Sequence, residues 1–211
     1  DPYNRSMVDG KHMGKPLKYS SVAISGRPGA GRSTLLKNLR QYLEPLCWEF
    51  FSGGDWSRQF SIAAGKQDPN DVKHHLATDY GDDVDLQIDV AMRKKMSDPD
   101  VHMAIESWIG GWNARGIPHV LRVLLMCDDA LRIDRIVNRD NISVNEAKVH
   151  LRKREKENVA KWKRMYHTND FWGPKHYDLV INTYSHSPAE TLNLVLQALG
   201  YYTANGQKAH A

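Results

Sequence analysis

Short strand-like runs and longer helix-like runs alternate regularly from Tyr19 onward. Consecutive apolar or β-branched residues predict five strands, at residues 21–25, 48–52, 101–108, 119–127 and 177–182. Apolar side chains at helical spacing, with capping residues, predict helices at residues 32–46, 55–64, 129–138, 143–167 and 187 to about 200. The polar stretch 67–99 is also expected to be helical. This alternation predicts a three-layer α/β fold with a parallel sheet covered by helices on both faces.

The two ends of the chain fall outside this regular pattern. Residues 1–18 lack apolar periodicity, and we expect them to form a disordered or expression-derived tail. Residues 203–211 are small and polar and are expected to fray. A single domain of residues 19–202 remains. Ligands of a parallel sheet bind beyond the carboxyl ends of its strands, so the chemistry is expected just after each strand.

Composition narrows the class of protein. The 211 residues are 41% hydrophobic and 26% charged, which fits one soluble domain, and no run of 18 apolar residues predicts a membrane span. The net charge of +4 is too small to argue for nucleic acid, although basic residues are dense over 152–164. We expect Cys47 and Cys127 to be buried free thiols of a reducing compartment, and hence a cytoplasmic protein.

A glycine-rich loop follows the first predicted strand and precedes a helix. It reads Gly26, Arg27, Pro28, Gly29, Ala30, Gly31, Arg32, Ser33 and Thr34, which matches the phosphate-binding pattern G-x-x-x-x-G-K-[ST] except at Arg32. Glycines let backbone N–H groups curl around a phosphate, and the helix N-terminus favours the anion. An ordinary glycine-rich turn is the alternative, but the strand–loop–helix context favours a phosphate loop.

Arg32 is the position at which this loop departs from the phosphate-binding pattern. Arginine keeps the positive charge of the usual lysine but replaces a compact ammonium by a wide planar fork. Phosphate binding is compatible with that change, whereas phosphoryl transfer depends on tight positioning and is more sensitive to it.

Charged residues follow the second predicted strand. Ser52 is followed by Asp55 and, about one helical turn later, by Arg58, so that both charged side chains can face one cleft. An arginine fork suits a phosphate group. The alternative is that Asp55 only caps the helix and Arg58 lies on the surface.

Two later helices carry further arginines. Arg135 and Arg139 are four residues apart, which places them on one face of the helix after the fourth strand. Arg152 and Arg154 lie on the long helix 143–167, and of these two Arg154 is preferred as a functional residue. A solvated face of mixed charge is the alternative for both helices.

Taken in order, these stretches resemble the nucleoside monophosphate kinases, and among them the short, archaeal-like cytidylate kinases. The resemblance covers about residues 20–201 and also includes the lid-like start Ile142-Ser143-Val144-Asn145-Glu146-Ala147. It implies a sheet of strand order 2-3-1-4-5, an acceptor-binding insert at about 55–98 and a short lid at about 140–165. It further implies ATP, Mg²⁺ and a nucleoside monophosphate, CMP or dCMP first. We expect a monomer with no membrane or nucleic-acid partner.

The resemblance also assigns roles to individual residues. Those that would bind nucleotide are Gly26, Gly29, Ala30, Gly31, Arg32, Ser33, Thr34 and Arg135. Those that would neutralise charge during transfer are Arg32, Arg139 and Arg154. Those that would bind the acceptor are Ser52, Asp55, Arg58 and Trp112. Ser33 and Glu106 would hold the metal ion. Asp85 and Asp89 are candidates for contact with the acceptor, although surface exposure is the simpler expectation for them.

The chain departs from the family pattern at charged positions. Besides Arg32, Trp108 stands where an arginine is usual, and further family arginines fall at Val159 and Lys161. Either the site is retuned for another acceptor, with the indoles of Trp108, Trp112 or Trp56 stacking on a flat group, or catalysis has weakened and the domain only binds nucleotide. Core packing is the simpler alternative for Trp108 and Trp112. Rival functions are therefore a nucleotide-binding module, a kinase for another small acceptor and, least favoured, a basic nucleic-acid binder.

Overall fold

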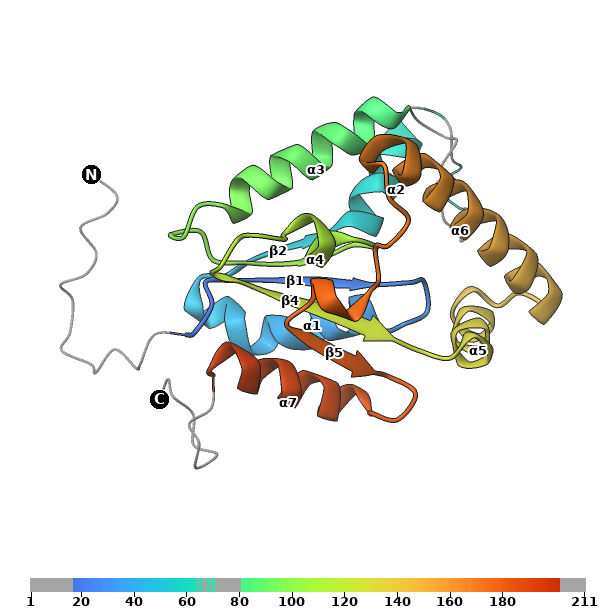
Figure 1. Cartoon of the computed structure of the whole chain (residues 1–211). Helices are drawn as coiled ribbons and strands as arrows, with labels where there is room; N and C mark the ends of the chain where they lie inside the picture. The colour runs from blue at the N-terminus through green and yellow to red at the C-terminus, as the bar shows by residue number, and fades with distance from the viewer. Residues whose placement is uncertain (1–16, 64, 66–67, 69, 71–80, 202–211) are drawn as a thin grey trace, which may run out of the picture.

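The computed structural model describes residues 17–63, 65, 68, 70 and 81–201. Five parallel strands form one sheet in the order β2-β3-β1-β4-β5. Their bounds are β1 (Ser21–Gly26), β2 (Glu49–Ser52), β3 (Met103–Glu106), β4 (Val120–Met126) and β5 (Leu179–Asn182). The predicted fold class and strand order are confirmed (Figure 1).

Helices cover both faces of the sheet (Figure 1). They are α1 (Arg32–Leu43), α2 (Gly53–Ala63), α3 (Asp82–Met96), α4 (Gly110–Asn113), α5 (Asp129–Asp140), α6 (Val144–Tyr166) and α7 (Pro188–Leu199). Two 3-10 turns, η1 (Glu44–Leu46) and η2 (Pro174–His176), complete the described elements. Helices α1 and α7 pack together on one face, and α4 packs on the other. None of the helices among the described residues has the length and apolar character needed to cross a bilayer.

Successive side chains of β1 point to opposite faces of the sheet and so belong to two different parts of the hydrophobic core. Val22 and Ile24 point toward α1 and α7, while Ala23 points to the opposite face, as successive side chains of a strand must. On that opposite face the buried Ser25 hydroxyl accepts a 2.8 Å hydrogen bond from the Gly111 N–H, which ties α4 to the strand. The core therefore fixes the end of β1 from which the glycine-rich loop leaves.

Several predicted bounds are wrong in detail. Strand β3 ends at Glu106, before Trp108, because the chain turns there into the unpredicted one-turn helix α4. Helix α2 begins at Gly53, so Asp55 lies in its first turn and is not the cap. Cys47 is exposed and Cys127 is only half-buried, because Cys47 follows the surface turn η1 in a left-handed conformation. Residues 1–16 and 203–211 of the expected tails, and most of 64–80, lie outside the described residues. The last two residues of the first tail belong to the domain: Leu17 packs against the core, and the Lys18 N–H donates a 2.8 Å hydrogen bond to the Leu199 carbonyl oxygen.

Candidate active site

The glycine-rich loop joins β1 to α1 in a backbone conformation that requires glycine. Gly29 has φ 80°, and a Cβ at that position would lie 2.7 Å from the Arg132 carbonyl oxygen on α5. Gly31 has φ 99° and directly precedes the first residue of α1. Only glycine adopts such positive φ angles without strain. The loop therefore packs closely against α5 and directs the α1 N-terminus outward.

A cavity of about 420 Å³ opens at this loop, beyond the carboxyl ends of the strands. Most of the predicted site residues line it: Gly29, Gly31, Arg32, Ser33, Thr34, Ser52, Asp55, Glu106, Arg135, Arg139 and Arg154. Trp108, His186 and Pro188 line it as well. The fold thus gathers side chains from β2, β3, α1, α5 and α6 around one space.

Glu106 is the central carboxylate of this cavity. It ends β3, its side chain is 2% exposed, and it is the register partner of Ser52 on β2 and of Ile24 on β1. Its Oε1 accepts a 2.6 Å hydrogen bond from Ser52 Oγ and a 3.4 Å hydrogen bond from Ser33 Oγ. One carboxylate therefore joins the ends of three structural elements.

Arg32 lies against the other oxygen of this carboxylate. Arg32 Nη1 is 3.0 Å from Glu106 Oε2, and the Arg32 side chain is 12% exposed. Neither atom has a hydrogen bond of good geometry to any described residue, so the contact is a charge pairing. Burial lowers the pKa of Arg32, and the charges of Arg139 and Arg132 lower it further, while Glu106 opposes them. Positive charge is thus concentrated at the loop.

The arginines of α5 have different surroundings. Arg135 Nη1 donates to the Gly29 carbonyl oxygen and to Thr183 Oγ1, each at 3.1 Å, and Arg135 Nη2 donates to the Thr183 carbonyl oxygen at 2.9 Å. Arg139 forms a bidentate pair with the neighbouring Asp140, at 2.6 and 2.7 Å. Arg135 therefore connects the loop at Gly29 to Thr183, while Arg139 contributes a half-exposed guanidinium to the cavity wall.

Arg154 on α6 is 6% exposed, and its guanidinium lies 5.3 Å from the ring centroid of Trp108. It also lines a second, smaller cavity of about 90 Å³ between α2, α3, α4 and α6. Trp108 and Arg154 are thus shared by the two cavities. Arg152, two residues earlier, is exposed, which agrees with the preference for Arg154.

The second cavity is lined by acidic residues that were expected to be exposed. Asp85 forms a 2.9 Å ion pair with Lys161, whose side chain is 3% exposed. Asp89 accepts a hydrogen bond from the Tyr166 hydroxyl, and burial raises the pKa of Asp89 to about 6. Surface exposure was therefore the wrong expectation, because α6 covers this side of α3. The only sequence signal was their spacing of four residues.

Four predicted site residues line neither cavity. Gly26 lies at the end of β1, and Ala30 is buried with its carbonyl oxygen accepting a 2.9 Å hydrogen bond from Thr183 Oγ1. Arg58 is half-buried on α2. Trp112 is 7% exposed and packs on Phe171 and Tyr166, which is the core packing given as its simpler alternative; acceptor binding by Trp112 stays a prediction.

The strand order, the loop between β1 and α1 and the arginine-lined cavity define a P-loop phosphotransferase fold. Solved structures of similar fold include a protein of unknown role from Eubacterium ventriosum (TM-score 0.62, 14% identity, covering 85% of this chain and 98% of that one). Another is a gluconokinase from Sinorhizobium meliloti (TM-score 0.52, 12% identity, covering 88% and 94%). A third is a shikimate kinase from Acinetobacter baumannii in complex with shikimate (TM-score 0.50, 14% identity, covering 85% and 92%).

The sequence comparisons are more specific. Residues 67–185 match the model of the cytidylate kinase-like family. A cytidylate kinase of Haloarcula marismortui is 29% identical over 190 residues, covering 90% of this chain and 94% of that protein. Another, from Natronomonas pharaonis, is 30% identical over 181 residues, covering 86% and 90%. The chain belongs to the cytidylate kinase-like family and is a nucleoside monophosphate kinase by class.

Proposed function

We propose that the chain transfers the γ-phosphoryl group of ATP to a nucleoside monophosphate, with CMP or dCMP as the first acceptors, giving ADP and the nucleoside diphosphate. The observation that carries the proposal is that Arg154 lines both the loop cavity and the second cavity. A cation between two adjoining sites is suited to charge that develops between donor and acceptor. Relatives with the name cytidylate kinase, matching along most of the chain, support the choice of acceptor.

The donor phosphates would lie on the loop. The backbone N–H groups around Gly29 and Gly31 and the N-terminus of α1 favour anions there. The base would extend toward Arg135 and His186, where the larger cavity continues. The acceptor phosphate would enter from the side of Ser52 and Asp55, which line the larger cavity. Arg58 is on the same helix as Asp55 but lines neither cavity, so it would have to turn toward the acceptor to anchor its phosphate.

The corner beside the loop fits Mg²⁺. The oxygen atoms of Ser33 and Glu106 are of the kind that Mg²⁺ prefers, and Glu106 Oε2 is buried without a hydrogen-bond partner among the described residues. These two residues would hold the ion directly or through water. When bound, Mg²⁺ supplies charge neutralisation on the donor phosphate oxygens.

The transfer step is balanced without a covalent enzyme intermediate. An acceptor phosphate oxygen bonds to the γ-phosphorus while the bond from that phosphorus to the bridging oxygen of ADP breaks. Arg32, Arg139 and Arg154 offset the negative charge spread over the moving group. The protein's part is therefore positioning and electrostatic stabilisation.

The pairing of Arg32 with Glu106 favours a second candidate, a nucleotide-binding protein with weakened catalysis. The cation that would face the donor phosphates is here neutralised in part by a buried carboxylate. A binding module of this kind would bind ATP by its loop amides but would transfer phosphate slowly or not at all.

A coupled assay for ADP release tests both candidates. ATP, Mg²⁺ and each nucleoside monophosphate are supplied in turn, and ATP binding is measured separately by calorimetry. Turnover with CMP or dCMP supports the proposal. Turnover with only a different acceptor would show that this acceptor, and not CMP, is the substrate. ATP binding without turnover of any acceptor would support the nucleotide-binding candidate.

A further inference from the structure

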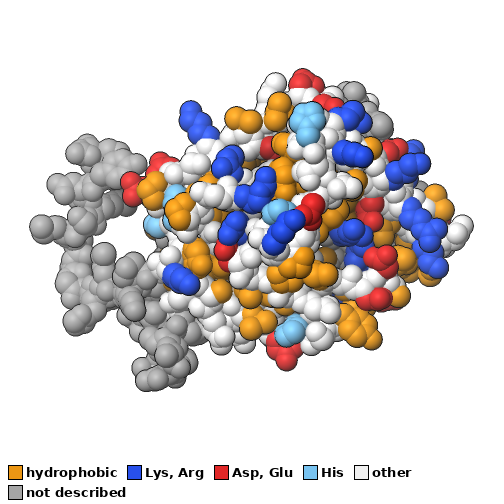
Figure 2. Space-filling view, viewed as in Figure 1, with side chains coloured by type: hydrophobic (Ala, Val, Ile, Leu, Met, Phe, Trp, Pro, Cys, Tyr) orange, Lys and Arg blue, Asp and Glu red, His pale blue; other side chains and the backbone are white. Residues whose placement is uncertain are grey.

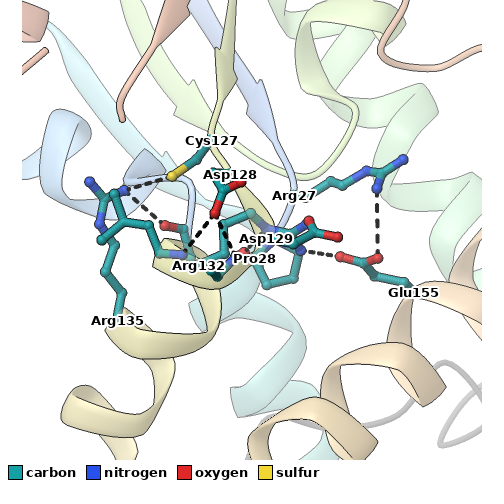
Figure 3. Close-up of polar contacts among 11 residues, drawn as sticks. Arg27, Pro28, Cys127, Asp128, Asp129, Arg132, Arg135 and Glu155 are labelled. Atoms are coloured by element: carbon teal, nitrogen blue, oxygen red, sulfur yellow. Dashed lines mark hydrogen bonds and ion pairs between the residues drawn. The ribbon is translucent and has the colours of Figure 1, made fainter. Parts of the chain in front are cut away.

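Arg132 on α5 is a buried arginine outside the residues assigned above. It is 1% exposed, and all three of its terminal nitrogen groups donate hydrogen bonds. Nε donates to the Pro28 carbonyl oxygen at 2.8 Å, Nη1 donates to Asp129 Oδ1 at 2.6 Å, and Nη2 donates to Glu155 Oε1. Figure 3 shows the Arg132 guanidinium between the phosphate loop and Glu155 of α6.

Glu155 reaches the loop a second time. Its Oε2 lies 3.9 Å from Arg27 Nη1 (Figure 3). The Arg27 guanidinium is also 4.8 Å from the ring centroid of Trp172. Arg27 and Pro28 occupy unspecified positions of the phosphate-loop pattern. One carboxylate of the lid helix is therefore tied to two consecutive loop residues.

These ties differ in strength. The Arg27 contact is long and half-exposed, so it is worth little in water. The Arg132 contact is sheltered, with side-chain exposures of 2% for Arg132 and 22% for Glu155. Removing Glu155 would leave the buried Arg132 charge paired with Asp129 alone, whose side chain is 76% exposed, and the loss of the more sheltered partner is costly. Arg132 is therefore the main connection between the loop and α6.

Arg154 directly precedes Glu155 on α6. Consecutive helical residues are about 100° apart around the axis, since a turn contains about 3.6 residues. Arg154 therefore faces the two cavities and Trp108 while Glu155 faces Arg132 and the loop. The setting of Glu155 fixes the rotation of the helix at Arg154.

We propose that Arg132 and Glu155 are positioning residues that fasten the lid helix to the phosphate loop and hold Arg154 where it meets donor and acceptor. The kinetic part of this inference rests on the proposed function, while the fastening itself does not. Neither residue lines the two cavities; both act by placing Arg154 relative to the Pro28–Gly29 turn.

The test compares Glu155→Gln with Lys153→Gln on the same helix. Lys153 forms an exposed 3.9 Å pair with Glu157, so its loss serves as a matched control. We expect Glu155→Gln to lower kcat by about tenfold or more, with less than about threefold change in KM for ATP, because misplacement acts on transfer more than on binding. Lys153→Gln should leave both constants unchanged.

A second variant separates positioning from a general loss of structure. In an Arg154→Met background, Glu155→Gln should cause little further loss of kcat, because both changes remove the same interaction. Full additivity of the two losses, or a Glu155→Gln kcat within about twofold of wild type, overturns the proposal.

Amide hydrogen exchange provides a readout that does not need turnover. Glu155→Gln should accelerate exchange in residues 144–166 and in the loop 26–31, beyond any change in Lys153→Gln. If the wild-type protein shows no kinase activity, the proposed function fails. The exchange rates of Glu155→Gln and Lys153→Gln then test by themselves whether Arg132 and Glu155 fasten α6 to the loop. Equal exchange in the two variants refutes it.

Discussion

Arg32 and Glu106 face each other at 3.0 Å, so the loop cation and the carboxylate proposed for Mg²⁺ partly neutralise one another. Arg32 stands where the phosphate-loop pattern has lysine, and its long planar head reaches the carboxylate at the end of β3. The charge at the loop therefore depends on two residues, Arg32 on α1 and Glu106 at the end of β3.

Arg32→Lys is expected to raise kcat with CMP by about tenfold, because a compact ammonium can approach the donor phosphates more closely. The measurement is the coupled assay at saturating ATP, with Arg40→Lys as the control. Arg40 lies on the same helix in an exposed 3.2 Å pair with Glu44. A slower Arg32→Lys enzyme would mean that the guanidinium fork itself serves the reaction.

Glu106→Gln is expected to lower the free energy of unfolding by about 3 kcal/mol, because it leaves the buried Arg32 charge without its counterion. Urea denaturation measures the change. The double variant Arg32→Met, Glu106→Gln should recover part of the loss, since no unpaired charge then remains. A loss below about 1 kcal/mol in the single variant would contradict this account.

Asp89 should make stability fall as pH rises through its range of titration. Its folded-state pKa is raised from 3.8 to about 6 by burial, with Asp85 adding to the rise and hydrogen bonds from Tyr166 and Asn113 opposing it. The folded state then holds the proton more tightly than the unfolded state. Its contribution is therefore largest below about pH 4, where both states are protonated, declines as pH rises to about 6, and is flat above.

Asp89→Asn removes this contribution. Relative to wild type, it should be more stable at pH 7.5, by at most about 3 kcal/mol, and the gain should vanish near pH 4. Urea titrations at several pH values, with the exposed Asp83→Asn on the same helix as control, measure it. If Asp89→Asn has the same pH dependence of stability as the wild type, the raised folded-state pKa of Asp89 is wrong.

Trp112→Ala is expected to destabilise the protein by about 3–5 kcal/mol, because the indole is buried against Phe171 and Tyr166. The milder Trp112→Phe should fold and should keep the KM for CMP within about twofold. A large rise of this KM in a stable Trp112→Phe protein would support Trp112 as an acceptor-binding residue.

Local signals were enough to predict much of the fold. Ser143 and Glu146 form the capping box expected from their spacing, and the Ser187–Glu190 box likewise starts α7. Helix α4 was missed because Gly110 and Gly111 disfavour a helix. Gly111 is there for packing: a Cβ at that position would lie 2.8 Å from the Tyr177 ring.

The part of the candidate site that was predictable consists of residues in a sequence motif or at the end of a strand. The residues of the loop and Glu106 meet as the strand-end argument requires. Arg132 was not predictable, since a buried arginine and an exposed one look alike in sequence. The same holds for Asp89, whose partner Tyr166 is 77 residues away. Figure 2 shows why charge alone misleads: Lys and Arg mix with Asp and Glu over the side where Figure 1 places α5 and α6.

The aromatic cluster under α6 also has an optical consequence. Trp162 on α6 lies 5.5 Å from Trp108 and 6.2 Å from Trp172, measured between ring centroids. Indole fluorescence depends strongly on neighbouring rings and on contact with water. Any shift of α6 away from the sheet changes all three indole environments together. The protein thus carries intrinsic fluorophores that register the position of α6 without a label.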